Sequence, residues 1–172
     1  MSPVYEFSGN APAVAEDAFV APNASIIGRV TLGSGSSAFY GAVLRGDVAD
    51  IKVGSNSNLQ DNVVLHADPG FPTSIGDGVS VGHGAVVHGC TVENDCLIGM
   101  GATVMNGAVI GAGSLVAGGA VVLEGTQIPP RSLVAGVPAK VRREISDQEF
   151  VGIQENAEHY RKLSQEHRKL HG

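Results

Sequence analysis

Hydrophobic residues recur along this chain with a period of six. Between Val92 and Val122 an aliphatic residue occupies every sixth position, and the same pattern begins upstream at Val20. A period of six fits neither the 3.6-residue repeat of an amphipathic helix nor the two-residue alternation of a half-buried strand. Self-similarity at such a short, fixed period is typical of a solenoid, in which each coil stacks on the next. The pattern therefore predicts a repeat architecture.

Small residues fill much of each six-residue unit, and glycine follows the aliphatic residue in Ile98-Gly99 and Ile110-Gly111. Hexads of this form are typical of the left-handed parallel β-helix, in which three short strands make a coil of about 18 residues. Successive coils stack at the ~4.8 Å spacing of neighbouring strands. We therefore predict an all-β solenoid over residues 1–143.

Three irregularities interrupt the hexads. Three extra residues follow Leu44, four follow Leu65, and one residue is missing after Val87. The four extra residues fall in the segment 67–74, ADPGFPTS, whose prolines and glycine favour a turn. We predict a loop that leaves the solenoid at a corner.

The hexads fade after Val122, and we expect Pro129-Pro130 to end the regular coils. Residues 144–172 carry a helical pattern instead. Ser146 and Glu149 have the spacing of a capping box, and the apolar residues that follow are spaced like one face of a helix. They are Phe150, Ile153, Ala157, Tyr160 and Leu163. The chain is therefore predicted to end in a helix that packs along the solenoid as part of the same structural unit.

The composition agrees with this fold and excludes some functions. Gly makes up 24 of the 172 residues, aromatic residues only 5%, and the net charge is −6. This charge gives no basic footprint for nucleic acid or an anionic membrane. No apolar run approaches the ~20 residues of a membrane-spanning helix, and the N-terminal sequence lacks the pattern of a signal peptide. We expect a cytoplasmic protein with no nucleic-acid or membrane partner.

Two histidines occupy positions that the repeat relates to each other. His66 and His88 are each the second residue of a hexad, three hexads apart once the looped residues are discounted. Residues three hexads apart stack one coil above the other, about 5 Å apart, which suits two ligands of one metal ion. Arg45 holds the same position one coil earlier.

His83 is the third residue of its hexad and lies on a different face. It is about 16 Å along the chain from His88, too far to share an ion within one subunit. By the same counting Asp61 lies below it, with Gln60 alongside. The two columns can serve one metal only if a neighbouring subunit brings them together, and a head-to-tail contact of this kind must close into a ring. We predict a homotrimer with a three-histidine metal site at each interface.

A longer pattern around these residues resembles a known family. The chain contains LRGDVADIKVGSNSNLQDNVVLH, followed by VGHGAVVHGC and IGMGA. Over roughly Val14 to Arg143 this closely resembles the γ-class carbonic anhydrases and their bacterial relatives. The combination of RGD, NLQD and the three histidines is specific to that family, whereas the hexads and the closing GVPAK are shared with hexapeptide acyltransferases.

The resemblance implies that His66 and His88 of one subunit and His83 of the next bind zinc, or iron or cobalt in some members. It implies reversible hydration of CO2 to bicarbonate by a metal-bound hydroxide, since zinc lowers the pKa of a bound water to about 7.

By the same resemblance, Arg45 and Asp47 match the pair that holds the subunit interface, and Gln60 and Asp61 match the polar residues beside the metal-bound water. Gln60 would orient the hydroxide or CO2, and Asp61 would hold a ligand histidine or the arginine network.

The chain departs from the best-studied pattern of that family in its acidic residues. Val48 stands where that pattern has a glutamate, and the short loop 67–74 offers only Asp68. The proton released at each turnover must then leave by another route. Tyr160 of the terminal helix is a candidate, besides its predicted place in the core.

Other functions remain open from the sequence. The metal site could act on acyl-CoA thioesters, since a related subgroup resembles thioesterases. A CoA acyltransferase would use one histidine as a base without a metal, and the paired columns argue against it. A structural or assembly protein would use the metal only to lock its subunits together. Replacing Gln60 by Ala would then change stability alone.

Overall fold

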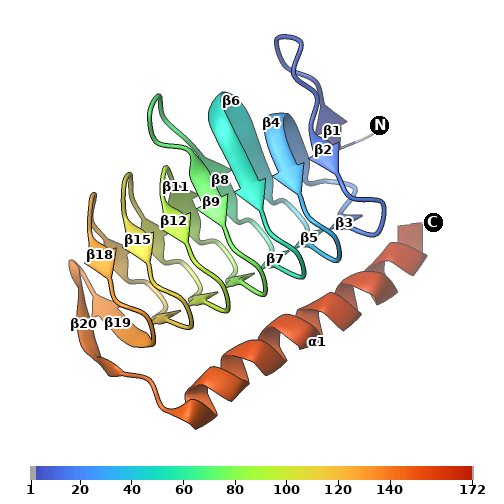
Figure 1. Ribbon diagram of the computed structural model, residues 1–172. Coiled ribbons are helices and arrows are strands. Elements are labelled where there is room, and N and C mark those ends of the chain that lie inside the picture. The colour runs from blue at the N-terminus through green and yellow to red at the C-terminus, as the bar shows by residue number, and fades with distance from the viewer. Residues whose placement is uncertain (1–2, 172) are drawn as a thin grey trace.

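The hexads form short strands that pair in parallel, coil upon coil, in three columns (Figure 1). The structure is a computed structural model that describes residues 3–171. The first column contains β1 (Val4–Tyr5), β8 (Val64–His66), β11 (Val86–His88), β14 (Thr103–Val104) and β17 (Val121–Val122). The second contains β2 (Ala13–Val14), β9 (Thr73–Ile75), β12 (Thr91–Val92), β15 (Val109–Ile110) and β18 (Gln127–Ile128).

The third column forms a sheet of its own. Its strands are β3 (Phe19–Val20), β5 (Ser37–Ala38), β7 (Asn58–Leu59), β10 (Ser80–Val81), β13 (Leu97–Ile98), β16 (Leu115–Val116), β19 (Ser132–Gly136) and β20 (Ala139–Glu144). Two longer strands, β4 (Ser25–Leu32) and β6 (Val43–Val53), join the first two columns, because β6 pairs with both β8 and β9. The three extra residues after Leu44 lie within β6 and shift its register against β4, which pairs Gly28 with Gly46 but Val30 with Ile51.

The predicted fold, a hexapeptide-repeat parallel β-helix with a helix alongside, is confirmed. One detail differs from the expectation. The coils do not end at Pro129-Pro130, because β19 follows the prolines and pairs in parallel with β16. The prolines occupy the turn between β18 and β19, where a missing backbone N–H interrupts no ladder. Only then does β20 return antiparallel to β19.

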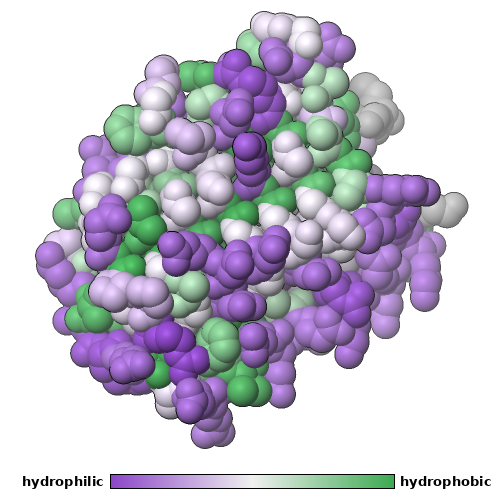
Figure 2. Space-filling view, viewed as in Figure 1, coloured by the Kyte–Doolittle hydropathy of each residue, from purple (hydrophilic) through white to green (hydrophobic). Residues whose placement is uncertain are grey.

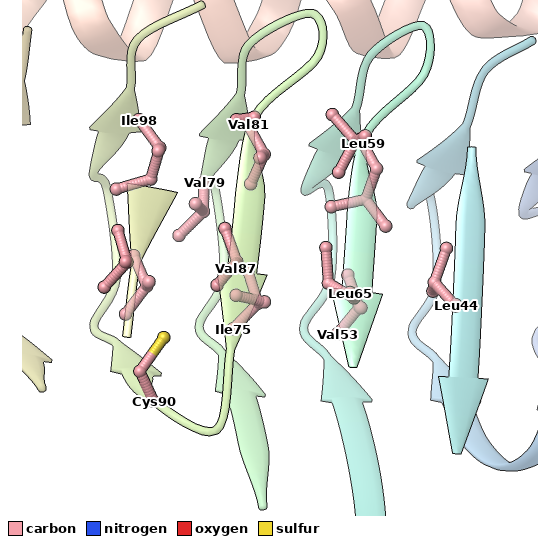
Figure 3. Close-up of a cluster of buried hydrophobic side chains, with 14 of the residues drawn as sticks. Leu44, Val53, Leu59, Leu65, Ile75, Val79, Val81, Val87, Cys90 and Ile98 are labelled. Atoms are coloured by element: carbon pink, nitrogen blue, oxygen red, sulfur yellow. The ribbon is translucent and has the colours of Figure 1, made fainter. Parts of the chain in front are cut away.

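The aliphatic residue of each hexad points into the space between the columns (Figure 3). Leu65 pairs in register with Leu44 on one coil and Val87 on the next, and all three are fully buried. Burying a side chain of this size stabilises the fold by roughly 1.5–3 kcal/mol. Cys90 and Cys96 belong to the same core, where burial raises the pKa of each thiol to about 12. Both therefore act as small packing residues.

Glycine after the aliphatic residue lets neighbouring coils approach closely. A Cβ atom on Gly82 would lie 2.7 Å from the backbone nitrogen of Met100 and 2.9 Å from the carbonyl oxygen of Ile98. Both obstacles are backbone atoms of the next coil, so a side chain here would push the coils apart. Gly82 also bears on the candidate site, because His83 is the next residue in the chain.

The helix α1 (Asp147–His171) lies along the third column and contacts β3, β7 and β10 (Figure 1). The capping box is present, since the backbone nitrogen of Glu149 donates to Ser146 Oγ at 3.1 Å and that of Ser146 donates to Glu149 Oε2 at 2.8 Å. Ile153 and Ala157 are buried against the solenoid. The helix thus fixes residues of its inner face against the corner that carries His83.

The outer side of α1 is strongly hydrophilic, as Figure 2 shows along the side of the molecule where the helix lies. Within residues 3–171, no helix combines the length and the apolar character needed to cross a bilayer.

Candidate metal centre

His66 and His88 lie on neighbouring coils in register. They end β8 and β11, which pair in parallel, and their ring centroids are 4.9 Å apart. The Nδ1 atom of His66 lies 2.9 Å from Nε2 of His88. Arg45 pairs with His66 on the preceding coil. The column predicted by counting hexads is therefore confirmed.

A hydrogen bond to Asp47 determines which nitrogen of His66 carries a hydrogen. His66 Nε2 lies 3.0 Å from Asp47 Oδ1. Burial raises the pKa of Asp47, but hydrogen bonds from Arg45 and His66 outweigh it and hold that pKa below its usual range. An ionised carboxylate can only accept, so Nε2 of His66 donates. In the neutral ring, Nδ1 then presents a lone pair.

Asn106 fixes His88 in the same way. Its Nδ2 donates to Asp68 Oδ2 at 2.9 Å, so its Oδ1 is the atom that lies 2.7 Å from His88 Nδ1. An amide oxygen only accepts, and His88 Nδ1 must therefore carry the hydrogen. Nε2 of the neutral ring is left with a lone pair.

The two nitrogens that face each other at 2.9 Å thus both present lone pairs. Two acceptors this close repel each other unless a cation or a proton lies between them. Neutral imidazole rings whose other nitrogen donates to a carboxylate or carbonyl group are typical ligands of zinc. The donor set of this group, which we name the His66–His88 cluster (His66, Asp68 and His88, with Asp47 and Asn106), therefore fits a divalent transition metal.

His83 belongs to a second group at the corner between β10 and β11. Its Nδ1 lies 2.9 Å from Asp61 Oδ2 and its Nε2 lies 3.2 Å from the Tyr160 hydroxyl on α1. Burial and the negative charge of Asp61 raise the pKa of the Tyr160 phenol. The stacking of Asp61 beneath His83 is as predicted. We name Gln60, Asp61, His83 and Tyr160 the His83 cluster.

Gln60 is the buried member of this cluster, and its Nε2 donates to Asn58 Oδ1 at 3.1 Å. It lines a cavity of about 310 Å³ together with His83, Tyr160 and Asn156. The cavity lies between α1 and the solenoid, so a small molecule in it would contact Gln60 and His83 together.

The structure places the seven predicted site residues in two separate groups. Arg45, Asp47, His66 and His88 lie at one corner, and Gln60, Asp61 and His83 lie at another. Among residues 3–171, the side chains positioned to share one ion are His66, Asp68 and His88, without His83.

Sequence reasoning missed Asn106, which orients His88, and Asn58, which orients Gln60. Counting hexads could not have found Asn106, because β14 pairs Val104 with Val87 of β11 and the column of His88 therefore continues at Met105.

Residues 89–124 match the bacterial transferase hexapeptide (six repeats) family. The "Probable carbonic anhydrase" of Methanocaldococcus jannaschii is 56% identical over 152 residues, covering 88% of this chain and 96% of that protein. Mitochondrial gamma carbonic anhydrase 2 of Arabidopsis thaliana is 48% identical over 91% of this chain. The chain spans only 58% of the length of that plant relative.

Among solved structures, a hexapeptide transferase family protein from Anaplasma phagocytophilum superposes with a TM-score of 0.91 at 41% identity. The match covers 94% of this chain and 96% of that one. The β-helix with its terminal helix is therefore shared along almost the whole chain.

Proposed function

Because this chain belongs to the γ-class carbonic anhydrase family, as its resemblance implied, we propose that it catalyses the reversible hydration of CO2 to bicarbonate. The observation that carries the proposal is the pair of facing, hydrogen-free nitrogens of His66 and His88, held from outside by Asp47 and Asn106. Two lone pairs held this close support metal binding, because a cation between them removes their repulsion.

Zinc is the proposed metal, with iron and cobalt as alternatives. His66 and His88 of one subunit would hold it together with His83 of a neighbour. When bound, zinc supplies Lewis acidity that lowers the pKa of a water ligand to about 7. The contact with Asp61 supports the role of His83, because it engages Nδ1. Nε2, which the Tyr160 hydroxyl contacts at 3.2 Å, would then be the ligand nitrogen once the metal takes the place of that contact.

The other predicted residues act on these ligands or on the substrate. Arg45 holds the carboxylate of Asp47, which in turn fixes His66, and Asp61 fixes His83. Gln60 has its amide oriented by Asn58, and its remaining polar groups would position CO2 or bicarbonate in the adjoining cavity.

We propose that the protein is a homotrimer in which head-to-tail contacts bring the His83 cluster of one subunit against the His66–His88 cluster of the next. The separation of the two clusters on different corners supports this assembly, because the three histidines that would hold one ion are divided between them. The cytoplasmic location expected from the N-terminal sequence remains a prediction, which subcellular fractionation would test.

The cavity beside His83 favours CO2 over the acyl-CoA alternative. A volume of about 310 Å³ lies at the lower end of the range of ligand pockets. It accommodates CO2 or bicarbonate easily, whereas a coenzyme A thioester is a much larger molecule. The acyltransferase alternative explains neither the facing nitrogens nor their outer partners.

Stopped-flow CO2 hydration tests the proposal, on protein purified anaerobically with metal content and oligomeric mass measured on the same sample. The variant Gln60→Ala should keep metal and mass while kcat/KM falls about tenfold or more, the effect of losing roughly 1.4 kcal/mol of transition-state stabilisation. Gln127→Ala, at an exposed position of β18, serves as the control and should be unaffected.

Unchanged hydration in Gln60→Ala would exclude this role of the side chain. A wild-type trimer that holds metal but does not hydrate CO2 would favour the structural or thioesterase alternatives. A wild-type protein that is monomeric and holds no metal would contradict the proposed metal site.

A further inference from the structure

The loop after β8 brings a carboxylate to the histidine pair. Asp68 follows His66 by two residues, and the ligand atoms of His66, Asp68 and His88 all lie within 4.8 Å of one another. The three side chains belong to one subunit and are partly buried. Two histidines and one carboxylate are a donor set that zinc enzymes use, with three protein ligands in all.

The loop is held in a defined conformation around Asp68. The backbone nitrogen of Phe71 donates to the Asp68 carbonyl oxygen at 2.9 Å, which closes the turn. The Phe71 ring covers Gly107, where an added Cβ would lie 3.3 Å from Cε1. The Thr73 hydroxyl donates to the His66 carbonyl oxygen at 2.6 Å. The four extra residues that break the hexads thus form an anchored loop.

Asn106 connects this carboxylate to the histidine pair. Its amide donates to Asp68 Oδ2 at 2.9 Å and accepts from His88 Nδ1 at 2.7 Å. One residue therefore orients both a carboxylate and a ring. The bond uses one oxygen of Asp68, and the other oxygen remains available as a ligand.

We propose that His66, His88 and Asp68 form a complete metal site within a single subunit, which takes up a divalent transition metal before the subunits assemble. The inference rests on the proposed function, in which His83 of a neighbour provides the third histidine, and Asp68 is displaced when that neighbour docks. Two histidines and a carboxylate carry one negative charge, whereas three neutral histidines carry none. Assembly therefore raises the uncompensated positive charge at the site, and the charge on Asp68 is the feature that distinguishes the two states.

The test compares zinc affinity, measured in competition with a chromophoric chelator, in His83→Ala and in His83→Ala/Asp68→Asn. His83→Ala should retain about one zinc per chain, as three protein ligands remain. The double variant should bind zinc roughly tenfold or more weakly, since loss of an outer partner alone costs about 10–100-fold. The new asparagine keeps an oxygen that accepts from Asn106, so the loop stays folded.

Asp95→Asn in the His83→Ala background is the matched control and should leave zinc affinity unchanged. Asp95 lies in the turn between β12 and β13 with a φ of 55°, a conformation that asparagine also adopts. Absence of zinc from His83→Ala, or equal affinities in the two test variants, would overturn the proposal. Failure of the wild-type protein to hydrate CO2 would instead refute the proposed function, and the difference in zinc affinity would still be measurable.

Discussion

His66 Nδ1 and His88 Nε2 face each other at 2.9 Å, and in the neutral rings neither nitrogen carries a hydrogen. The spacing of successive coils sets the distance between the rings. Asp47 and Asn106, which accept from the opposite nitrogens, set which atoms face inward. A repeat that serves packing everywhere else thereby places at one corner the two histidines of the proposed metal site.

Removing the outer partner of His88 should weaken metal binding. Asn106→Ala leaves His88 Nδ1 without its acceptor and frees the ring to change tautomer, so zinc affinity should fall by about 10–100-fold. Chelator competition measures the change. Asn10→Ala, an exposed asparagine with local bonds only, should bind zinc like the wild type. Equal affinities in the two variants would show that Asn106 does not position His88.

The cap of α1 predicts a dependence of stability on pH. A hydrogen bond from Arg143, followed by one from the backbone of Ser146, lowers the pKa of Glu149 from 4.5 to about 2. Since the folded pKa is the lower one, the ionised carboxylate stabilises the fold fully above pH 4.5, and this contribution is lost as the pH falls towards 2. Glu149→Gln should lower the Tm at neutral pH. It should also reduce the fall in Tm between pH 4.5 and about pH 2.

Thermal unfolding followed by circular dichroism measures this effect. Glu155→Gln, at an exposed position of the same helix, is the control and should keep the wild-type profile. Identical pH profiles for the wild type and Glu149→Gln would contradict a capping role.

Two glycines should respond to alanine in opposite directions. Gly82→Ala places a Cβ against backbone atoms of the next coil, and overpacking of this kind costs about 1–3 kcal/mol. Gly152 lies on α1 with no atom within 4 Å of an added Cβ, so alanine there should stabilise by about 0.8–1.0 kcal/mol. The Tm should fall in the first variant and rise in the second. A tolerated Gly82→Ala would show that the coils can separate freely.

The aliphatic hexad position should dominate stability. Ile110 is fully buried, and Ile110→Ala should reduce the free energy of unfolding by about 2–5 kcal/mol. Leu123, which is 47% exposed, directly follows another hexad position, and Leu123→Ala should stay within about 0.5 kcal/mol of the wild type. Denaturant titration at fixed protein concentration measures both. A similar loss of unfolding free energy in the two variants would mean that the aliphatic hexad position does not define the core.

Much of this architecture follows from periodicity alone. Counting hexads places His66 beside His88 and Asp61 beneath His83, because each residue's position in the repeat fixes its column. The same counting separates the two clusters. It works because a solenoid has only neighbour-to-neighbour contacts, so the register propagates from coil to coil.

Counting hexads could not predict the features that depend on loops or on the docking of the helix. The orientation of Asp68 is set by its loop and by Asn106, which no repeat encodes. The hydroxyl of Tyr40 bonds to His167 at 2.9 Å and to His171 at 3.0 Å, contacts that depend on how α1 docks. The coil after the prolines was missed because a turn tolerates proline where a strand does not.

If each active site is completed by two subunits, mixing two inactive variants should restore activity, and this experiment is the most direct test. His83→Ala and His88→Ala chains, co-expressed in equal amounts, are each expected to lack CO2 hydration alone. In randomly mixed trimers about one interface in four joins an intact His66–His88 pair to an intact His83. The mixture should therefore recover about a quarter of the wild-type hydration rate. A mixture as inactive as its components, or full activity in either variant alone, would contradict a shared site.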